Sequence, residues 1–379
     1  MMARLRVLEV NKAYFPHVGG IESIVRQYSE ELGTAHPDVK IRTLVCRDGF
    51  GTPMSECIGG VHLRRSGSMG TYFSCPLSLS FLRDFRKMAA NSDVVHIHVP
   101  FPLADLALLL SGFKGKVAVS WHSDIVKQKK LLKLYAPLLR SLLRRADIIF
   151  VATKGHIKGS DWLRPYARKC RVLPYGVNVE DYLTVPEKPL LTEKCTNKGS
   201  VKIFFTGRLV YYKGVDVLLK AFRAANLRNA ELFIAGSGEL EDSLRHFAVS
   251  SGIGDRVHFL GFLDDDDLKQ AYADCDIFVL PSVEKSEAFG IVQLEAMASG
   301  KPVINTRLPS GVPYVSIHGR TGLTVPPKDY RILAAAMRTL ASDESLRKKY
   351  GEAARKRAAE HFDEKTIIDR LYNYLSSGR

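Results

Sequence analysis

Two glutamates eight residues apart, Glu287 and Glu295, flank the start of a predicted helix and could bind the same ligand. They follow an apolar run at 277–281 that is typical of a buried strand. From Gly290 onward, apolar residues recur at helical spacing, so Glu287 lies on the loop before the helix and Glu295 lies inside it. The alternative is that either glutamate is a surface residue that compensates the helix dipole.

The start of this helix predicts a phosphate site. Phe289, Gly290 and Ile291 supply main-chain N–H groups without a partner inside the helix, at its positive dipole end. Gly290 also lets the main chain approach a ligand closely. Glu295 follows five residues after Gly290, which is about 7–8 Å of helix. A sugar joined through a diphosphate to a ribose would meet Glu287, the helix tip and Glu295 in turn.

A loop with two cations follows the predicted strand 202–206. Its sequence begins Gly207-Arg208 and ends Lys213-Gly214. Two cations on one glycine-flanked loop can clamp a diphosphate and stabilise it as a leaving group. The alternative is a pair of solvated surface cations.

Glycine pairs open two further loops. Gly19 and Gly20 precede a helix, a pattern that suits close approach to a phosphate or sugar but also occurs in simple turns. Gly236-Ser-Gly238 resembles part of a dinucleotide fingerprint, but Glu241 occupies the third glycine position, which disfavours NAD.

Histidines follow the strands of the first half. His122 comes directly after the predicted strand 117–121, where it can donate to a sugar hydroxyl or polarise a leaving group, unless it is only a satisfied histidine before a capping Ser-Asp. For His96 and His98 we expect packing, because they lie within or at the end of a strand. These histidines show no metal-ligand spacing. The acidic run 264–267 directly precedes a helix and is interpreted as an N-cap and first turn, so no metal is expected.

Composition indicates a soluble globular chain of two domains. The chain has 379 residues, of which 46% are hydrophobic and 25% are charged. No apolar run reaches the roughly 18–20 residues of a membrane span. The N-terminal stretch 1–10 reads as a strand and not as a signal peptide. Six scattered cysteines without CxxC spacing predict reduced thiols in a cytosolic protein.

The net charge of +15 requires an explanation. Cations cluster at 83–87 and at 127–145, and in the second segment leucines interleave with them. The cations of the second segment are Lys127, Lys129, Lys130, Lys133, Arg140, Arg144 and Arg145. This basic amphipathic pattern suits an anionic membrane surface, or simply a solvated helix face. No nucleic-acid module accompanies the charge, so nucleic acid is not an expected partner.

Strands and helices alternate through both halves. The strands are expected at 4–10, 41–46, 94–98, 117–121, 148–152 and 171–174, and then at 202–206, 231–235, 257–260, 277–281, 302–305 and 322–325. Apolar strands that alternate with helices indicate an α/β fold with parallel sheets covered on both faces. The chain therefore predicts two doubly wound, Rossmann-like domains facing a cleft. The expected boundaries are 1–177, a linker at 178–200, a second domain at 201–362, and a helix at 363–379.

Together these motifs resemble the retaining glycosyltransferases of family 4, which have the two-domain GT-B fold. The resemblance covers nearly the whole chain and is most specific at Glu287 to Glu295 and the Ala-Met-Ala-Ser-Gly that follows. The stretches 121–129, 207–214 and 308–315 resemble a bacterial subgroup that includes O-antigen and exopolysaccharide α-mannosyltransferases. Where many members carry Gly-Gly and a glutamate, this chain has Ser310-Gly311 and Val312-Pro313, and we assign that segment no role.

The resemblance implies a role for each matching residue. Arg208 and Lys213 would hold the donor diphosphate, and Glu295 would bind the ribose. Glu287 would bind donor-sugar hydroxyls, helped by N–H groups at 289–291, and His122 would contact the transferred sugar near its reacting carbon. Gly19 and Gly20 would line the diphosphate and acceptor side, with Gly236 on the donor side. The helix at 363–379 would cross back to the first domain.

The expected function is that of a retaining hexosyltransferase in cell-surface polysaccharide biosynthesis, such as lipopolysaccharide. It would transfer a hexose, foremost mannose from GDP-mannose, to a lipid-linked saccharide acceptor. A UDP-hexose donor is the alternative, and an epimerase or hydrolase acting on sugar nucleotides is a more distant one. No metal or other cofactor is expected. The expected location is cytoplasmic, peripherally associated with the inner face of the membrane.

Overall fold

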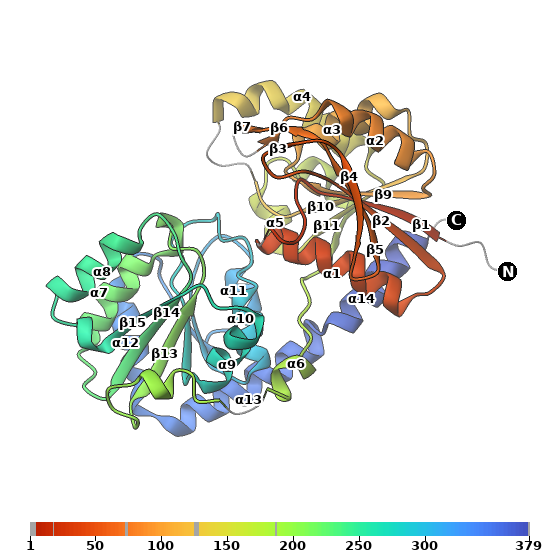
Figure 1. The fold of residues 1–379 in the computed structure, drawn as a ribbon. Coiled ribbons are helices and arrows are strands. Elements are labelled where there is room, and N and C mark those ends of the chain that lie inside the picture. Colours follow the sequence, from red (N-terminus) through yellow and green to blue (C-terminus); the bar gives the residue numbers. More distant parts are fainter. Residues whose placement is uncertain (1–4, 18, 73–74, 125–128, 186–187, 378–379) are drawn as a thin grey trace. The chain divides into compact units, whose positions relative to one another are not determined.

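A computed structural model describes residues 5–17, 19–72, 75–124, 129–185 and 188–377 of the chain (Figure 1). The chain divides into two compact units, each built around one large sheet. The first unit comprises Met1–Tyr175 and Lys365–Arg379, and the second comprises Gly176–Glu364. Both are α/β units of the kind that the alternating strands and helices predict.

The first unit has an eight-stranded sheet in the order β12-β11-β10-β9-β1-β2-β5-β4. All neighbouring strands are parallel except β4 and β5. Its strands are β1 (Leu5–Val10), β2 (Val39–Cys46), β4 (Met54–Ile58), β5 (Val61–Ser66), β9 (Val94–Val99), β10 (Lys116–Trp121), β11 (Ile148–Val151) and β12 (Cys170–Val172). Four two-residue strands, β3 (Phe50–Gly51), β6 (Ser68–Met69), β7 (Thr71–Tyr72) and β8 (Cys75–Pro76), form two small antiparallel pairs.

Helices flank this sheet. They are α1 (Gly20–Ala35), α2 (Leu79–Ala89), α3 (Pro102–Ser111), α4 (Lys129–Arg145), α5 (Lys154–Gly159), the 3-10 helix η1 (Arg164–Lys169) and α14 (Glu364–Ser376). In α1 the buried residues Ile24, Val25, Tyr28 and Leu32 recur at the spacing of one helix face. Every residue of β9 is buried, as expected for a strand covered on both faces.

The hairpin β4–β5 is absent from the predicted strands. Its residues alternate between exposed and half-buried in β4, and β5 carries His62, Arg64 and Arg65, so neither strand forms an apolar run. The turn between them is Gly59-Gly60, and both glycines have positive φ. A Gly-Gly pair between alternating segments is a hairpin signal, and it is the feature from which this hairpin could have been predicted.

The second unit has a six-stranded parallel sheet in the order β15-β14-β13-β16-β17-β18. Its strands are β13 (Val201–Thr206), β14 (Ala230–Ala235), β15 (Val257–Gly261), β16 (Ile277–Leu280), β17 (Val303–Thr306) and β18 (Gly322–Val325). Successive strands from β13 to β15 extend the sheet towards one edge, and β16 to β18 extend it towards the other, so the strand order reverses between β13 and β16. In doubly wound sheets, such a point at the carboxyl ends of the strands is where ligands bind.

The helices of the second unit are α6 (Glu180–Leu183), α7 (Val215–Ala225), α8 (Glu241–Ser250), α9 (Asp265–Asp274), α10 (Val292–Ala298), α11 (Val312–Val315), α12 (Tyr330–Ser342) and α13 (Glu344–His361). Three 3-10 turns accompany them, η2 (Thr192–Lys194), η3 (Tyr211–Lys213) and η4 (Gly254–Arg256). The interpretation of the acidic run is confirmed, because the Asp264 carboxylate accepts from the Asp267 N–H as the N-cap of α9.

The segment expected as a linker packs against the second unit. Leu191 is fully buried, and its N–H donates to Asp274 at 2.7 Å. The Thr196 hydroxyl donates to Glu231 at 2.9 Å. The described residues of this segment thus belong to the second unit and include a short helix, α6, and the turn η2.

Helix α14 packs on the first unit, to which residues 365–379 belong. Ile367, Ile368, Leu371 and Leu375 are its buried face. The Lys116 ammonium at the start of β10 donates to the carbonyl of Tyr374 at 2.6 Å. Residues far apart in sequence therefore complete one sheet-and-helix layer.

Candidate active site

An ion pair between Lys213 and Glu287 lies where the sheet order of the second unit reverses. Lys213 ends the turn η3 after β13, and Glu287 lies on the loop after the neighbouring strand β16. The Lys213 Nζ lies 2.6 Å from Glu287 Oε2, and the Ser282 hydroxyl donates to the same oxygen at 2.9 Å. Among the described residues both contacts fall on Oε2, so Oε1 is the oxygen that can accept from a ligand hydroxyl.

Burial and the neighbouring charge shift the pKa of Lys213 in opposite directions. Lys213 and Glu287 are only 9% and 8% exposed. Burial alone lowers the pKa of Lys213, but the adjacent Glu287 carboxylate outweighs burial and raises this pKa above its ordinary value. The lysine therefore stays an ammonium that can attract a diphosphate.

Arg208 shares the loop with Lys213 but is exposed. Its guanidinium donates to the Tyr212 hydroxyl at 3.2 Å. The loop packs tightly on the next strand end, because a Cβ at Gly236 would lie 2.1 Å from the carbonyl oxygen of Gly207. Gly236 also has φ +114°, which disfavours any other residue. Gly236 therefore serves to let two loops meet at the carboxyl ends of β13 and β14.

The turn before α10 is held by buried amides. Gly290 has φ +73°, and a Cβ there would lie 2.4 Å from Leu280. The Gln293 amide donates to the carbonyl of Phe289 at 2.7 Å and accepts from Asn305 at 3.1 Å. Phe289 is buried. Gln293 and Asn305 thus fix the main chain of 289–291, and neither was among the predicted site residues.

Glu295 lies one turn into α10 and bonds to a buried tyrosine. The Tyr272 hydroxyl donates to Glu295 Oε2 at 2.6 Å and also contacts the carbonyl of Val292. Burial raises the pKa of Glu295, and the hydrogen bond from Tyr272 opposes this. Tyr272 orients the carboxylate, and nothing in its sequence context marked it as a partner of Glu295.

Gly19 and Gly20 open α1 in the first unit, as the sequence predicts. Gly19 is the N-cap and Gly20 the first helical residue. A Cβ at Gly19 would lie 2.4 Å from the Glu22 carboxylate, so glycine leaves space for this buried acid.

His122 follows β10 and belongs to a buried hydrogen-bonded chain. Its Nε2 lies 2.9 Å from His98 Nδ1, and its Nδ1 lies 2.7 Å from the Tyr175 hydroxyl. Both ring nitrogens are thus engaged, and the residue is only 4% exposed. In this geometry a sugar hydroxyl can bond to the ring only by replacing one of these partners.

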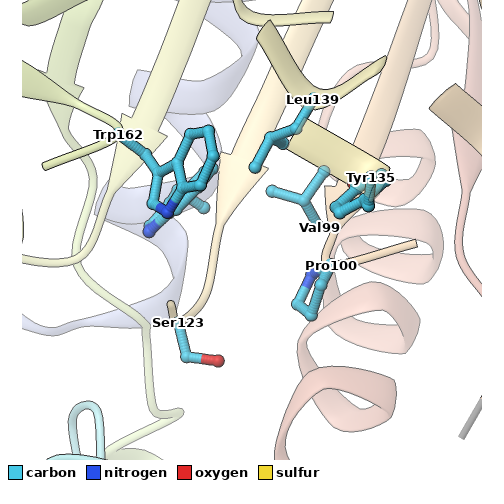
Figure 2. Close-up of a pocket in the computed structure, with 7 residues that line it drawn as sticks. Val99, Pro100, Ser123, Tyr135, Leu139 and Trp162 are labelled. Carbon is cyan, nitrogen blue, oxygen red and sulfur yellow. The ribbon is translucent and has the colours of Figure 1, made fainter. Parts of the chain in front are cut away.

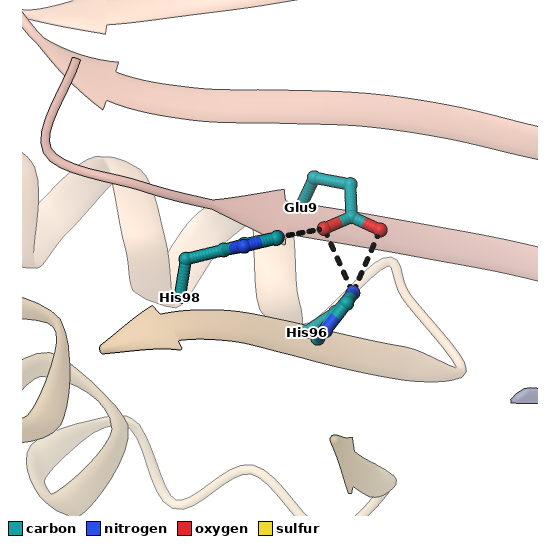
Figure 3. A group of neighbouring side chains, drawn as sticks. All are labelled: Glu9, His96 and His98. Atoms are coloured by element: carbon teal, nitrogen blue, oxygen red, sulfur yellow. Dashed lines mark hydrogen bonds and ion pairs between the residues drawn. The ribbon is translucent and has the colours of Figure 1, made fainter. Parts of the chain in front are cut away.

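Figure 3 shows that the series of hydrogen bonds continues from His98 to the Glu9 carboxylate on β1. Glu9 accepts from His98 Nε2 at 2.9 Å and from His96 Nδ1 at 3.0 Å. His96 and His98 are buried as predicted, but Glu9, which joins them, was not predicted. Alternate residues of β1 and β9 share a face, so a charged residue in the apolar run of β1 was the signal.

The same three residues form the one group, within the part of the chain that the structure describes, whose ligand atoms lie close enough to hold a metal ion. These atoms already hydrogen-bond to one another, and all three side chains are fully buried. Hydrogen bonding therefore accounts for the arrangement without an ion.

A small pocket lies beside His122 in the first unit. Figure 2 shows Val99, Pro100, Ser123, Tyr135, Leu139 and Trp162 around it, and Trp121 also lines it. It lies at the carboxyl ends of β9 and β10, the edge where this unit would contact a ligand. Its volume of about 10 Å³ is roughly that of one water molecule, which is too small for a sugar ring.

The basic segment 127–145 contributes to the core. Lys127 and its neighbours at 125–128 lie outside the described residues. In α4, Leu139, Leu142 and Leu143 are buried in the core of the first unit, while Lys133, Arg140 and Arg144 are exposed. Leu134 is 81% exposed. These three leucines therefore explain part of the amphipathic pattern by packing. No helix in the described ranges is long and apolar enough to cross a membrane.

Comparisons with known proteins show the family of this chain. Residues 19–176 match the glycosyl transferase 4-like domain, and residues 192–357 match the glycosyl transferases group 1. The chain is 37% identical to the D-rhamnosyltransferase WbpZ of Pseudomonas aeruginosa, over 89% of this chain and 86% of the relative. It is 31% identical to the O-antigen chain mannosyltransferase C of Escherichia coli, over 98% of each chain.

Solved structures agree on the fold. Sucrose-phosphate synthase from Thermosynechococcus elongatus superposes with a TM-score of 0.80 at 21% identity, covering 99% of this chain and 100% of that one. Anabaena HepE in complex with UDP also gives 0.80, at 19% identity, covering 98% and 100%. The chain therefore belongs to the group 1 glycosyltransferases with family 4-like domains and the GT-B fold, and it is a hexosyltransferase.

Proposed function

We propose that this protein is a retaining mannosyltransferase that uses GDP-mannose and acts on a lipid-linked saccharide in cell-surface polysaccharide synthesis. The observation that carries the proposal is the similarity to the O-antigen chain mannosyltransferase over 98% of both chains. The buried Lys213–Glu287 pair supports it, because it places a cation and a hydroxyl acceptor together.

In the proposed reaction, the bonds change as follows and each residue has one role. The bond between the sugar's anomeric carbon and the diphosphate breaks, while the acceptor oxygen bonds to the same face of that carbon. The acceptor proton passes to the departing diphosphate oxygen. Arg208 and Lys213 stabilise the negative charge on this leaving group, a role that metal ions have in other enzymes. Glu287 Oε1 accepts from a donor-sugar hydroxyl, and Glu295 binds the ribose.

D-Rhamnose is the second candidate for the transferred sugar. The relative with 37% identity is a D-rhamnosyltransferase. D-Rhamnose is 6-deoxymannose, so the two donors differ by one oxygen. A pocket that hydrogen-bonds this hydroxyl would discriminate strongly, whereas an apolar pocket would not.

The acceptor-side unit is proposed to dock on the inner face of the cytoplasmic membrane. Leu109 and Leu110 at the end of α3 are 57% and 60% exposed. Leu110 lines a surface groove together with Arg83, Arg86 and Lys87 of α2. Exposed leucines beside three cations suit anionic lipid headgroups.

Thermal unfolding with nucleotide sugars tests the donor. A ligand that binds only the folded state, at 100-fold above its Kd, stabilises by about 2.7 kcal/mol. GDP-mannose should raise Tm, and radiolabelled mannose should then appear in a lipid-extractable product. GDP-D-rhamnose and UDP-glucose are the matched comparisons. A Tm increase with UDP-glucose but not with either GDP sugar would overturn the proposed donor.

A further inference from the structure

We propose that Glu9, His98 and Tyr175 are positioning residues that hold the His122 imidazole in one tautomer and one orientation for glycosyl transfer. The inference rests on the proposed function and on the role that the family resemblance implies for His122, which is contact with the transferred sugar. It gives Glu9, His98 and Tyr175 a positioning role, and it changes what His122 can do.

The four side chains form one continuous line of hydrogen bonds. Tyr175 contacts His122 at 2.7 Å, His122 contacts His98 at 2.9 Å, and His98 contacts Glu9 at 2.9 Å. The rings of His98 and His122 stack, with centroids 5.1 Å apart and an interplanar angle of 12°. Each residue is at most 7% exposed, so water does not compete for these bonds.

The carboxylate at one end sets the direction of every proton. Glu9 can only accept, so His98 Nε2 carries a proton and donates to it. A neutral His98 then has a bare Nδ1, which accepts from His122 Nε2–H. His122 Nδ1 is bare in turn and accepts from the Tyr175 hydroxyl. One anion thus selects the Nε2-protonated tautomer of both histidines.

The charge states agree with this assignment. Burial by itself raises the pKa of Glu9, but His96 and His98 outweigh it and lower this pKa to about 2. Burial, with the neighbouring His96, lowers the pKa of His98 to about 4, although Glu9 opposes this. Burial also lowers the pKa of His122, and His98, His96, His156 and Lys12 add to the effect. Burial raises the pKa of Tyr175, which stays a donor.

The buried charged network costs folding free energy, which favours a functional role for it. A buried carboxylate loses its hydration, and apolar residues of similar volume would pack at least as well. A second arm of the network, Ser120 to His96 to Glu9, shares the carboxylate but does not lead to His122. This arm provides an internal control.

The network changes the expected role of His122. The sequence predicts a donor to a sugar hydroxyl, but the tautomer set by Glu9 leaves Nδ1 as an acceptor. A sugar hydroxyl that replaces Tyr175 would therefore donate to His122. A buried carboxylate behind a histidine fixes tautomer and orientation in the same way in serine proteases.

Nitrogen-15 NMR of histidine-labelled protein tests the tautomer without any substrate. In the wild-type protein, His122 should show a protonated Nε2 and a bare Nδ1 from pH 5 to 9. Its signals are identified by their loss in a His122→Asn variant. A protonated Nδ1, a doubly protonated ring, or fast exchange between tautomers would overturn the proposal. This result stands whatever the donor sugar is.

A pair of variants two residues apart on β9 tests the positioning. His98→Gln keeps an amide contact to Glu9 but loses the Nδ1 atom that accepts from His122. His96→Gln instead changes a hydrogen bond to Glu9 that does not lie on the line to His122. His98→Gln should mix the His122 tautomers and lower kcat for GDP-mannose about 10- to 100-fold with little change in KM, the range for losing an outer hydrogen-bond partner. His96→Gln should leave the tautomer unchanged and kcat within about twofold. Equal effects of the two variants would mean a purely structural role.

Metal analysis of the purified protein closes the remaining alternative. A stoichiometric ion that both variants lose would assign Glu9, His96 and His98 to a metal site and overturn the hydrogen-bonded chain. If GDP-mannose is the wrong donor, every variant and the wild-type protein will be inactive with it. The NMR result will still decide the proposal.

Discussion

Lys213 Nζ and Glu287 Oε2 lie 2.6 Å apart, so two residues assigned to neighbouring groups of the donor, its diphosphate and its sugar, form one buried pair. Removing one partner of such a pair leaves an unpaired buried charge, which costs about 3–5 kcal/mol. Lys213→Ala should therefore lower the free energy of unfolding by this amount, measured by urea denaturation. Adding Glu287→Gln to Lys213→Ala should recover part of the loss.

The matched control for this pair is Lys220→Ala. Lys220 pairs with Asp216 at 3.1 Å on the surface of α7, where such helix pairs contribute about 0.3–0.5 kcal/mol. If Lys213→Ala costs no more than Lys220→Ala, the buried pair does not exist in solution.

Arg208 gives the cleaner test of the diphosphate clamp because it is exposed. Its guanidinium donates to the Tyr212 hydroxyl at the surface, so Arg208→Ala should leave Tm nearly unchanged. Loss of an electrostatic stabiliser of the leaving group should lower kcat by roughly 10- to 1,000-fold. Steady-state transfer from GDP-mannose measures this, with the exposed Arg228→Ala as control. Near-normal turnover would remove Arg208 from the catalytic residues.

The sequence predicted most of the fold because parallel strands buried on both faces read as apolar runs, as in β13 and β16. It placed Glu287 and Glu295 on the correct elements because helical spacing resumes at Gly290. It could not predict that Lys213 pairs with Glu287, since this contact joins loops 74 positions apart. Likewise, Glu9 meets His98 only because β1 and β9 are neighbours in the sheet.

Transfer should not require a divalent metal. The acidic run 264–267 caps α9, and two cations, Arg208 and Lys213, stand on the loop that is proposed to hold the diphosphate. Mannosyl transfer should therefore proceed at an unchanged rate in excess EDTA. Loss of activity that Mn²⁺ or Mg²⁺ restores would show that a metal site had been missed.

Membrane association should depend on cations of the first unit. Each cation near an anionic surface contributes about 1 kcal/mol. Changing Arg83, Arg86 and Lys87 to Glu should release the protein from anionic vesicles in a sedimentation assay, and so should changing Lys127, Lys129, Lys130 and Lys133. Binding should also weaken as salt rises.

The control for the vesicle assay reverses three exposed lysines of α13, namely Lys348, Lys349 and Lys356. This variant should still sediment with anionic vesicles. Equal binding to neutral and anionic vesicles, or release by the α13 variant alone, would contradict docking through the first unit.

Asp105 should make stability fall as pH rises. Burial raises the pKa of this α3 carboxyl to about 7, although the hydrogen bond from Tyr135 opposes the rise. Between pH of about 4 and 7 the folded state binds more protons than the unfolded state, so the free energy of unfolding decreases across this window. Asp105→Asn should thus be more stabilising at pH 8 than at pH 5, by about 2.5 kcal/mol.

Urea denaturation at the two pH values measures this effect, with the exposed Asp48→Asn as control. Below pH 6.5 the wild-type protein also has an opposite slope from His98, whose lowered pKa of about 4 makes acid destabilising. The difference in free energy of unfolding between Asp105→Asn and the wild-type protein therefore isolates the contribution of Asp105 to the pH dependence. The same difference at both pH values would contradict the raised pKa.

Helix α14 has a consequence for the order in which the chain folds during synthesis. Its apolar face fills a place in the first unit, and Lys116 bonds to its final turn. The ribosome makes residues 176–364 before this helix emerges. The first unit therefore lacks its last helix while the second unit is being synthesised. The second unit is contiguous in the chain and can fold as it is synthesised, whereas the first is finished only after it.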